Sequence, residues 1–181
     1  MNHFAIVLLC AGLGLAGVAL AEDAAPNADP DAPVTAYWAE HEEVDELGKL
    51  PRAYGCDDLF YKYRDILLKL GVRPGIKIYT YGCTRPGQPA SGTTKVDLTY
   101  DLPHPAPTGF KAYHRSVTLT AGDPKSLTVD DCALLDDMRQ TVIAAISNQV
   151  DAHGLDCGSG HHHKKFKLTV QTLVAAETQT Q

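Results

Sequence analysis

Four cysteines follow an uncharged stretch at the start of this chain, and together they constrain its fold more than any other feature. The uncharged stretch runs from Phe4 to Ala21 and ends in a small-x-small pattern, which is typical of a cleaved signal peptide. We therefore expect residues 1–21 to be removed, leaving a periplasmic or extracellular protein with no membrane span. An even number of cysteines in an exported chain predicts disulfide bonds. The four are Cys56, Cys83, Cys132 and Cys157.

The negative charge of the chain is concentrated near its N-terminus. The net charge is −6, and residues 22–55 hold nine acidic side chains against two basic ones, so the remainder is nearly neutral. We expect 22–55 to be an acidic, largely disordered leader with a short helix over 35–50, and 177–181 to be a tail. The disulfide-containing domain is then expected at 56–176. The acidic balance and the export signal both argue against nucleic acid as a partner.

Hydrophobic periodicity predicts two helices and four strands in the domain. Apolar residues spaced three and four apart predict the helices, and alternation of apolar and polar residues predicts the strands. We expect helices over 57–70 and 130–150, and strands over 76–81, 95–100, 110–120 and 165–171. Each helix has one apolar stripe to bury, which favours a single small α+β domain of order α-β-β-β-α-β. In it an antiparallel four-stranded sheet carries both helices on one face. Poor alternation in the third strand predicts a bulge near 114–116.

This topology constrains the pairing of the cysteines. Cys56 and Cys83 fall at the same end of the predicted domain, so we expect them to form a disulfide. A continuous helix from Cys132 to Val150 would be about 27 Å long. The residues from there to Cys157 reach at most about 25 Å when fully extended. A Cys132–Cys157 bridge therefore requires that the helix ends early or breaks, and the pairing of these two cysteines stays unresolved at this point.

The face of the predicted sheet that the helices leave open is a candidate binding surface. Alternation places basic and tyrosine side chains on it, a composition that binds phosphates, single-stranded bases or anionic sugars. Export makes nucleic acid unsuitable, so an envelope protein, an anionic glycan or the chain's own acidic leader is the expected ligand. The alternative is that lysine, threonine and tyrosine simply suit a solvated strand surface. The predicted binding residues are Lys77, Tyr79, Tyr81, Lys95, Lys111, Tyr113, Arg115, Lys165 and Lys167.

A second candidate is the glycine-bounded loop over 151–163. It concentrates four of the eight histidines and one cysteine, which are ligand types that Zn and Cu favour. No C-x₂-C or H-x₃-H framework accompanies them, and two following lysines would repel a cation. The alternative to a metal site is therefore a solvated loop whose cysteine is in a disulfide. The candidate metal ligands are His153, Cys157, His161, His162 and His163.

Catalytic motifs are missing from the sequence. It contains no G-x-S-x-G, no G-x-x-x-x-G-K-[ST] and no strand-linked G-x-G-x-x-G. The residues from His41 to Asp45 open like a zincin motif but lack the second histidine, which favours a solvated acidic segment. The sequence thus predicts an exported, non-catalytic binding or envelope-associated module without a cofactor. A periplasmic Zn- or Cu-binding protein is the alternative, and a hydrolase with a cysteine nucleophile is a distant third.

Overall fold

The computed structural model describes residues 32–48, 54–87, 92–147, 150–151, 155, 157 and 166–176, and the expected signal peptide lies outside these ranges. The chain forms one antiparallel sheet and a layer of helices. The elements in chain order are β1 (Val34–Leu47), α1 (Cys56–Lys69), β2 (Lys77–Tyr81), β3 (Thr94–Pro105), β4 (Phe110–Thr120), a 3-10 turn (Val129–Asp131), α2 (Cys132–Gln140), α3 (Val142–Ile146), β5 (Val150–Asp151) and β6 (Lys167–Ala175).

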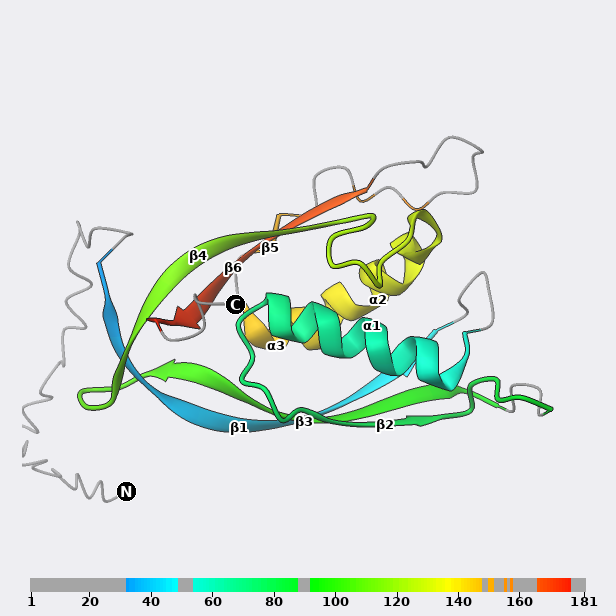
Figure 1. The fold of residues 1–181 in the computed structure, drawn as a ribbon, viewed down its shortest axis with the longest axis horizontal. Coiled ribbons are helices and arrows are strands. Elements are labelled where there is room, and N and C mark those ends of the chain that lie inside the picture. The colour runs from blue at the N-terminus through cyan, green and yellow to red at the C-terminus, as the bar shows by residue number, and fades with distance from the viewer. Residues whose placement is uncertain are drawn as a thin grey trace, which may run out of the picture.

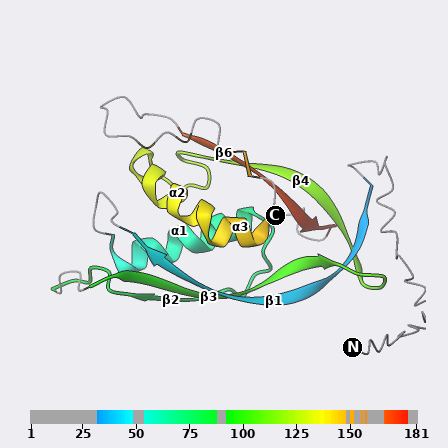
Figure 2. The same ribbon diagram turned by 180° about the vertical axis from the view of Figure 1, so that it is seen from behind.

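The sheet has six strands in the order β2-β3-β1-β4-β6-β5, so the prediction of four strands and two helices was wrong in number. The α+β class and the antiparallel pairing are confirmed. Figure 1 shows the sheet curling around the helices, with β1, β2 and β3 on one side of them and β4 and β6 on the other. The view from behind shows the same arrangement (Figure 2). The helices therefore cover the concave side of the sheet, where its apolar side chains are buried.

The segment in which the sequence predicted a helix and a disordered leader is the long strand β1. It pairs with β3 from Ala36 opposite Pro105 to Leu47 opposite Thr94. Its glutamates favour a helix in isolation, but alternation places Glu40, Glu42 and Glu46 on an exposed side of the sheet. Pairing with β3 then outweighs the local helix preference. The folded part of the chain consequently includes a strand that we expected to lie outside the domain.

Helix α1 forms where its sequence predicts it. The expected apolar stripe is buried along the concave side of the sheet: Leu59, Tyr63, Ile66, Leu67 and Leu70. Asp57 and Asp58 lie in the first turn and Lys69 in the last, where each complements the helix dipole. Gly71 ends the helix with a φ of 92°, a conformation that glycine adopts without strain.

The second predicted helix breaks in the middle. α2 ends at Gln140, Thr141 takes a non-helical conformation with φ −119° and ψ −94°, and a separate short helix α3 follows. The chain then returns as β5, whose Val150 pairs with Val170 of β6. The prediction of one helix over 130–150 was therefore wrong, although its apolar residues Leu135 and Met138 are buried as expected.

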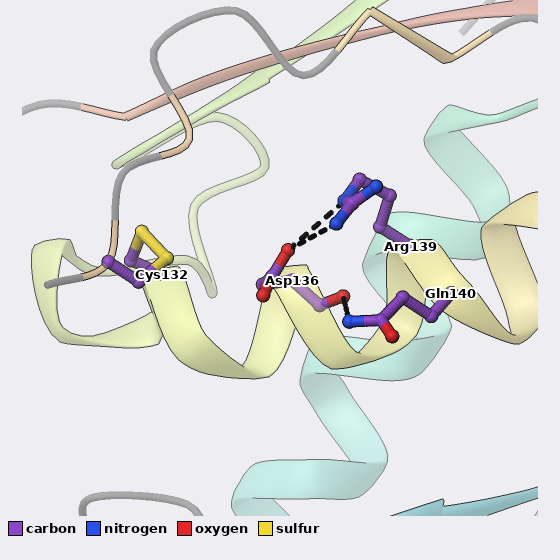
Figure 3. Close-up of a disulfide and its surroundings, with 5 residues drawn as sticks. Cys132, Asp136, Arg139 and Gln140 are labelled. Atoms are coloured by element: carbon purple, nitrogen blue, oxygen red, sulfur yellow. Dashed lines mark hydrogen bonds and ion pairs between the residues drawn. A yellow bond between two sulfur atoms is a disulfide. The ribbon is translucent and has the colours of Figure 1, made fainter.

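Both pairs of cysteines form disulfides. Cys56 and Cys83 are bonded, with 5.2 Å between their Cα atoms, which confirms the expected pair. Cys132 and Cys157 are also bonded, with Cα atoms 5.5 Å apart. The break in the helix at Thr141 meets the condition that this second bridge requires. Figure 3 shows it at the start of α2, next to the ion pair of Asp136 with Arg139.

Candidate functional site

The register of β4 decides which side of the sheet carries its basic residues. The pairing of β4 with β6 runs from Ala112 opposite Ala175 to Thr120 opposite Lys167 without an unpaired residue, so the predicted bulge is absent from this described ladder. Leu119 is buried on the concave side. Alternation without a bulge places Lys111, Tyr113 and Arg115 on that same side. These three residues therefore do not lie on the open face that the sequence predicted.

Two further side chains, Tyr37 of β1 and His104 of β3, lie next to Lys111, Tyr113 and Arg115. Thr35 pairs with Lys111, and the Lys111 ammonium group donates to the Thr35 hydroxyl at 3.4 Å. Tyr37 is two residues further along β1 and so points to the same side. It pairs with His104 of β3, and the two ring centroids are 5.5 Å apart. We call this group the concave patch: Tyr37, His104, Lys111, Tyr113 and Arg115.

The concave patch lies beyond the ends of the helices. The Thr172 hydroxyl donates to the backbone carbonyl of Leu70 at 2.8 Å, which marks where the end of α1 meets the sheet. Thr172 is the pairing partner of Arg115. Figure 1 shows the first half of β4 and its turn from β3 extending past α1 and α3. Tyr37 is accordingly 47% exposed, and the Lys111, Arg115 and His104 side chains are exposed as well.

The positive charges of the concave patch are not compensated within the part of the chain that the structure describes. Six basic side chains outside the patch form ion pairs with described carboxylates: Lys62, Arg64, Lys69, Arg73, Lys95 and Arg139. Lys111 and Arg115 have no carboxylate within ion-pair distance among the described residues. The patch can therefore offer both cations to an anion without first breaking an ion pair to any described residue.

A stacked pair continues the concave side next to the patch. The rings of His41 and Tyr100 pair across β1 and β3 with centroids 5.8 Å apart and planes 13° apart. Burial raises the pKa of Tyr100 to about 12, and the nearby charge of Glu43 adds to the effect. The Tyr100 hydroxyl therefore stays protonated, but it is buried and does not reach the surface of the patch.

The other predicted binding residues of the central sheet lie on its opposite, convex side. Lys77, Tyr79 and Tyr81 of β2 share that side with Lys95 of β3. It is not basic, because β1 and β3 place five carboxylates among them and Lys95 forms an ion pair with Glu46. The part of the expected leader that is β1 thus contributes acidic groups to this face as a neighbouring strand. The five carboxylates belong to Glu40, Glu42, Glu46, Asp97 and Asp101.

Of the last two predicted binding residues, Lys167 lies apart from both groups. Lys167 pairs with Thr120, so alternation along β4 puts it on the convex side of the β4–β6 pair. Lys165 lies outside the described residues. Of the nine predicted residues, four therefore lie on the convex side of β2 and β3, three in the concave patch and one on the convex side of the β4–β6 pair, while the ninth is outside the described residues.

The predicted metal site loses one of its ligands. The sulfur of Cys157 is bonded to Cys132, so it is not a thiolate that could bind Zn or Cu (Figure 3). His153, His161, His162 and His163 lie outside the described residues. Across the ranges that the structure does describe, no three side chains of histidine, cysteine, aspartate or glutamate gather to hold a metal ion. The disulfides also leave none of the four cysteines of the domain as a nucleophile.

The sequence did not reveal Tyr37 and His104 as members of a site. Tyr37 fell in the predicted helix and His104 in a proline-rich loop, whereas the structure places both on long paired strands. The one available signal was the alternation of Thr35, Tyr37, Ala39 and His41, which glutamates at neighbouring positions obscured.

Comparison with protein-family models, with curated proteins and with solved structures gives no match for this chain. Among the helices that the structure describes, none has the length and apolar character needed to cross a bilayer. The two disulfides are consistent with an oxidising, exported environment.

Proposed function

We propose that this protein is an exported, non-catalytic binding module whose concave patch holds an anionic polysaccharide. The observation that carries the proposal is the pair of cations, Lys111 and Arg115, which have no ion pair among the described residues and share the part of the concave side beyond the helices with Tyr37, Tyr113 and His104. Paired disulfides support a working environment outside the cytoplasm.

The chemistry of the patch suits a sugar chain that carries carboxylates. A guanidinium group binds a carboxylate through two parallel hydrogen bonds, and an ammonium group adds a second point of charge. Tyrosine rings offer a flat apolar surface with a polar end, against which the C–H face of a sugar ring can pack. Lys111 and Arg115 are four residues apart on one strand, so about 13 Å of backbone separates them. That spacing favours a chain with repeated charges over a single small anion.

A titration with two oligosaccharides of equal length tests the proposal. One is a uronic-acid oligomer and the other its neutral counterpart, and calorimetry measures the affinity of the wild-type protein for each. We expect binding of the uronate oligomer alone, weakening as salt rises because the contacts are ionic. Arg115→Ala and Lys111→Ala should each lower the affinity by about tenfold or more, since each removes a charged hydrogen bond.

Lys77→Ala is the matched control, because Lys77 is also an exposed lysine without a described ion pair but lies on the convex side. It should leave the affinity unchanged. Absence of uronate binding, or an equal loss in the Lys77→Ala variant, would show that the concave patch is not the binding site.

A further inference from the structure

The convex side of the central sheet is built in three cross-strand rows. Register aligns Lys77 with Thr99 and Glu42, then Tyr79 with Asp97 and Val44, and finally Tyr81 with Lys95 and Glu46. Each row runs from β2 across β3 to β1. We call these nine residues the outward face, and it shares no residue with the concave patch.

The outward face exposes much of the chain's uncovered apolar surface. Six large apolar side chains are exposed among the described residues, and three of them share this face. Tyr79 is 58% exposed, Val44 55% and Tyr81 50%. Tyr79 and Tyr81 are neighbours on one side of β2, and Asp97 lies between Tyr79 and Val44. Tyrosine is enriched in protein–protein contacts.

Opposite charges lie at the two edges of the outward face. Lys77 on β2 has no carboxylate within ion-pair distance among the residues described, and Glu42 on β1 has no described cation. Both occupy the first row, separated by Thr99. Their strands lie about 10 Å apart, and no ion pair joins the two groups. Each is therefore available to an opposite charge on another molecule.

We infer that a second copy of this chain covers the outward face, related by a two-fold axis parallel to the strands. This rotation places β2 of one copy over β1 of the other and keeps the rows level. Lys77 then meets Glu42 of the second copy, and Tyr79 meets Val44, each contact occurring twice. The inference is independent of the proposed polysaccharide site, which uses the other side of the sheet.

Charge complementarity selects this axis over the alternative. A two-fold axis perpendicular to the strands would place β1 over itself and bring Glu40, Glu42 and Glu46 against the same residues of the second copy. That arrangement juxtaposes like charges, which opposes association. With the parallel axis, β3 lies over itself, and its adjacent Lys95 and Asp97 alternate in sign. Identical residues of β3 keep the same level along this axis, so Asp97 faces Asp97 of the second copy under either axis, whereas Lys95 is already neutralised by Glu46 of its own chain.

Charge-reversed variants in sedimentation equilibrium test the inference. The mature chain should form a dimer whose dissociation constant rises by about tenfold or more in Lys77→Glu and in Glu42→Lys, because each creates two like-charge contacts. An equimolar mixture of the two variants should restore wild-type association. In the mixed dimer both contacts across the axis again join opposite charges, one of them with the signs exchanged. Lys167→Glu, a charge reversal on the convex side of another strand pair, should leave the dimer unchanged.

Three results would overturn the inference. One is a chain that stays monomeric at every concentration reached. Another is a dimer that neither single variant weakens, which would place the interface elsewhere. The third is a mixture that associates no better than the separate variants, which would mean that Lys77 and Glu42 do not meet across the axis.

Discussion

The ammonium nitrogen of Lys62 lies 2.8 Å from a carboxylate oxygen of Asp131, and both side chains are buried. This ion pair joins the middle of α1 to the turn before α2. Asp131 also accepts hydrogen bonds from the Tyr54 hydroxyl at 3.0 Å, and from the backbone N–H and hydroxyl of Thr128 at 2.7 and 2.8 Å. The carboxylate is therefore well satisfied, and it holds two parts of the helical layer together under the curled sheet.

Removal of Lys62 should destabilise the protein severely. Lys62→Met leaves the Asp131 carboxylate buried without its cation, which typically costs about 3–5 kcal/mol. Urea unfolding followed by circular dichroism measures the change. Lys69→Met is the matched control on the same helix, because its partner Asp123 is mostly exposed and such pairs contribute about 0–1 kcal/mol. Equal losses in the two variants would contradict the structural role given to the buried pair.

The stability that Asp131 contributes should disappear in acid. Burial acts to raise the pKa of Asp131, but the hydrogen bonds from Lys62 and Thr128 outweigh it and lower the pKa. The folded state thus binds the proton less tightly than the unfolded state does. The stabilising effect of the Asp131 carboxylate is present above the ordinary carboxyl pKa and is lost as pH falls through the lowered pKa of the folded state. Asp131→Asn should therefore cost most at neutral pH and progressively less in acid, as urea unfolding at a series of pH values will show.

The stability that the Asp45 carboxyl group contributes should depend on pH in the opposite direction. Burial raises the pKa of Asp45, the charges of Asp137 and Glu43 add to the rise, and the hydrogen bond from the Tyr63 hydroxyl at 2.6 Å opposes it. The folded state binds this proton more tightly, so stability declines as pH rises from the ordinary carboxyl pKa through the raised one. The cost of Asp45→Asn should consequently shrink as pH rises over that window. A cost that grows with pH would show that the buried carboxylate is stabilised in its charged form.

The two disulfides should contribute similar amounts of stability. Their sequence separations are 27 and 25 residues, and closing loops of this size stabilises a fold by about 3–4 kcal/mol in the chain-entropy description. Replacing either pair with serine should lower the free energy of unfolding by that amount.

Peptide mapping without reduction should yield the pairs Cys56–Cys83 and Cys132–Cys157. Recovery of Cys157 as a free thiol would contradict the fold around the break at Thr141.

Gly109 should tolerate no side chain. It has a φ of 145°, and a Cβ atom there would lie 1.9 Å from the backbone carbonyl oxygen of Ala36 on β1. Gly122 also has a positive φ, 84°, but nothing lies within 4 Å of its Cβ position. Gly122→Ala should cost about 1–2 kcal/mol for the backbone conformation alone. Gly109→Ala should cost clearly more, measured by thermal unfolding, because β1 must move away from β4; an equal cost would contradict this close approach.

Local sequence signals predicted the elements whose side chains alternate or recur with one clear period. The stripe from Leu59 to Leu70 specifies α1, and the alternation from Ile76 to Tyr81 specifies β2. β1 carries only a short signal of this kind, the alternation of Thr35, Tyr37, Ala39 and His41, which its glutamates obscure. Of its residues, Ala36, Asp45 and Leu47 are buried, and glutamates alternate between them. Its strand conformation comes from pairing with β3, a contact between distant parts of the chain that no local pattern encodes.

The candidate site was harder to predict because it depends on register. The residues Lys111, Tyr113 and Arg115 were identified from composition, but the expected bulge reversed the side to which they point. Without the bulge they share a side with Leu119, and they meet Tyr37 and His104 only because β1 lies between β3 and β4 in the sheet. The unbroken register of β4 thus places them on the opposite side of the sheet from Tyr79 and Tyr81, with which the sequence grouped them.

Amide NMR spectra recorded during a titration with the uronic-acid oligomer locate the anion-binding site residue by residue. We predict that the largest, saturable shift changes fall on Tyr37, His104, Lys111, Tyr113 and Arg115, with Tyr79 and Tyr81 unaffected. Changes centred on Tyr79 and Tyr81, or none at any residue, would contradict an anion-binding site on the concave side of the sheet.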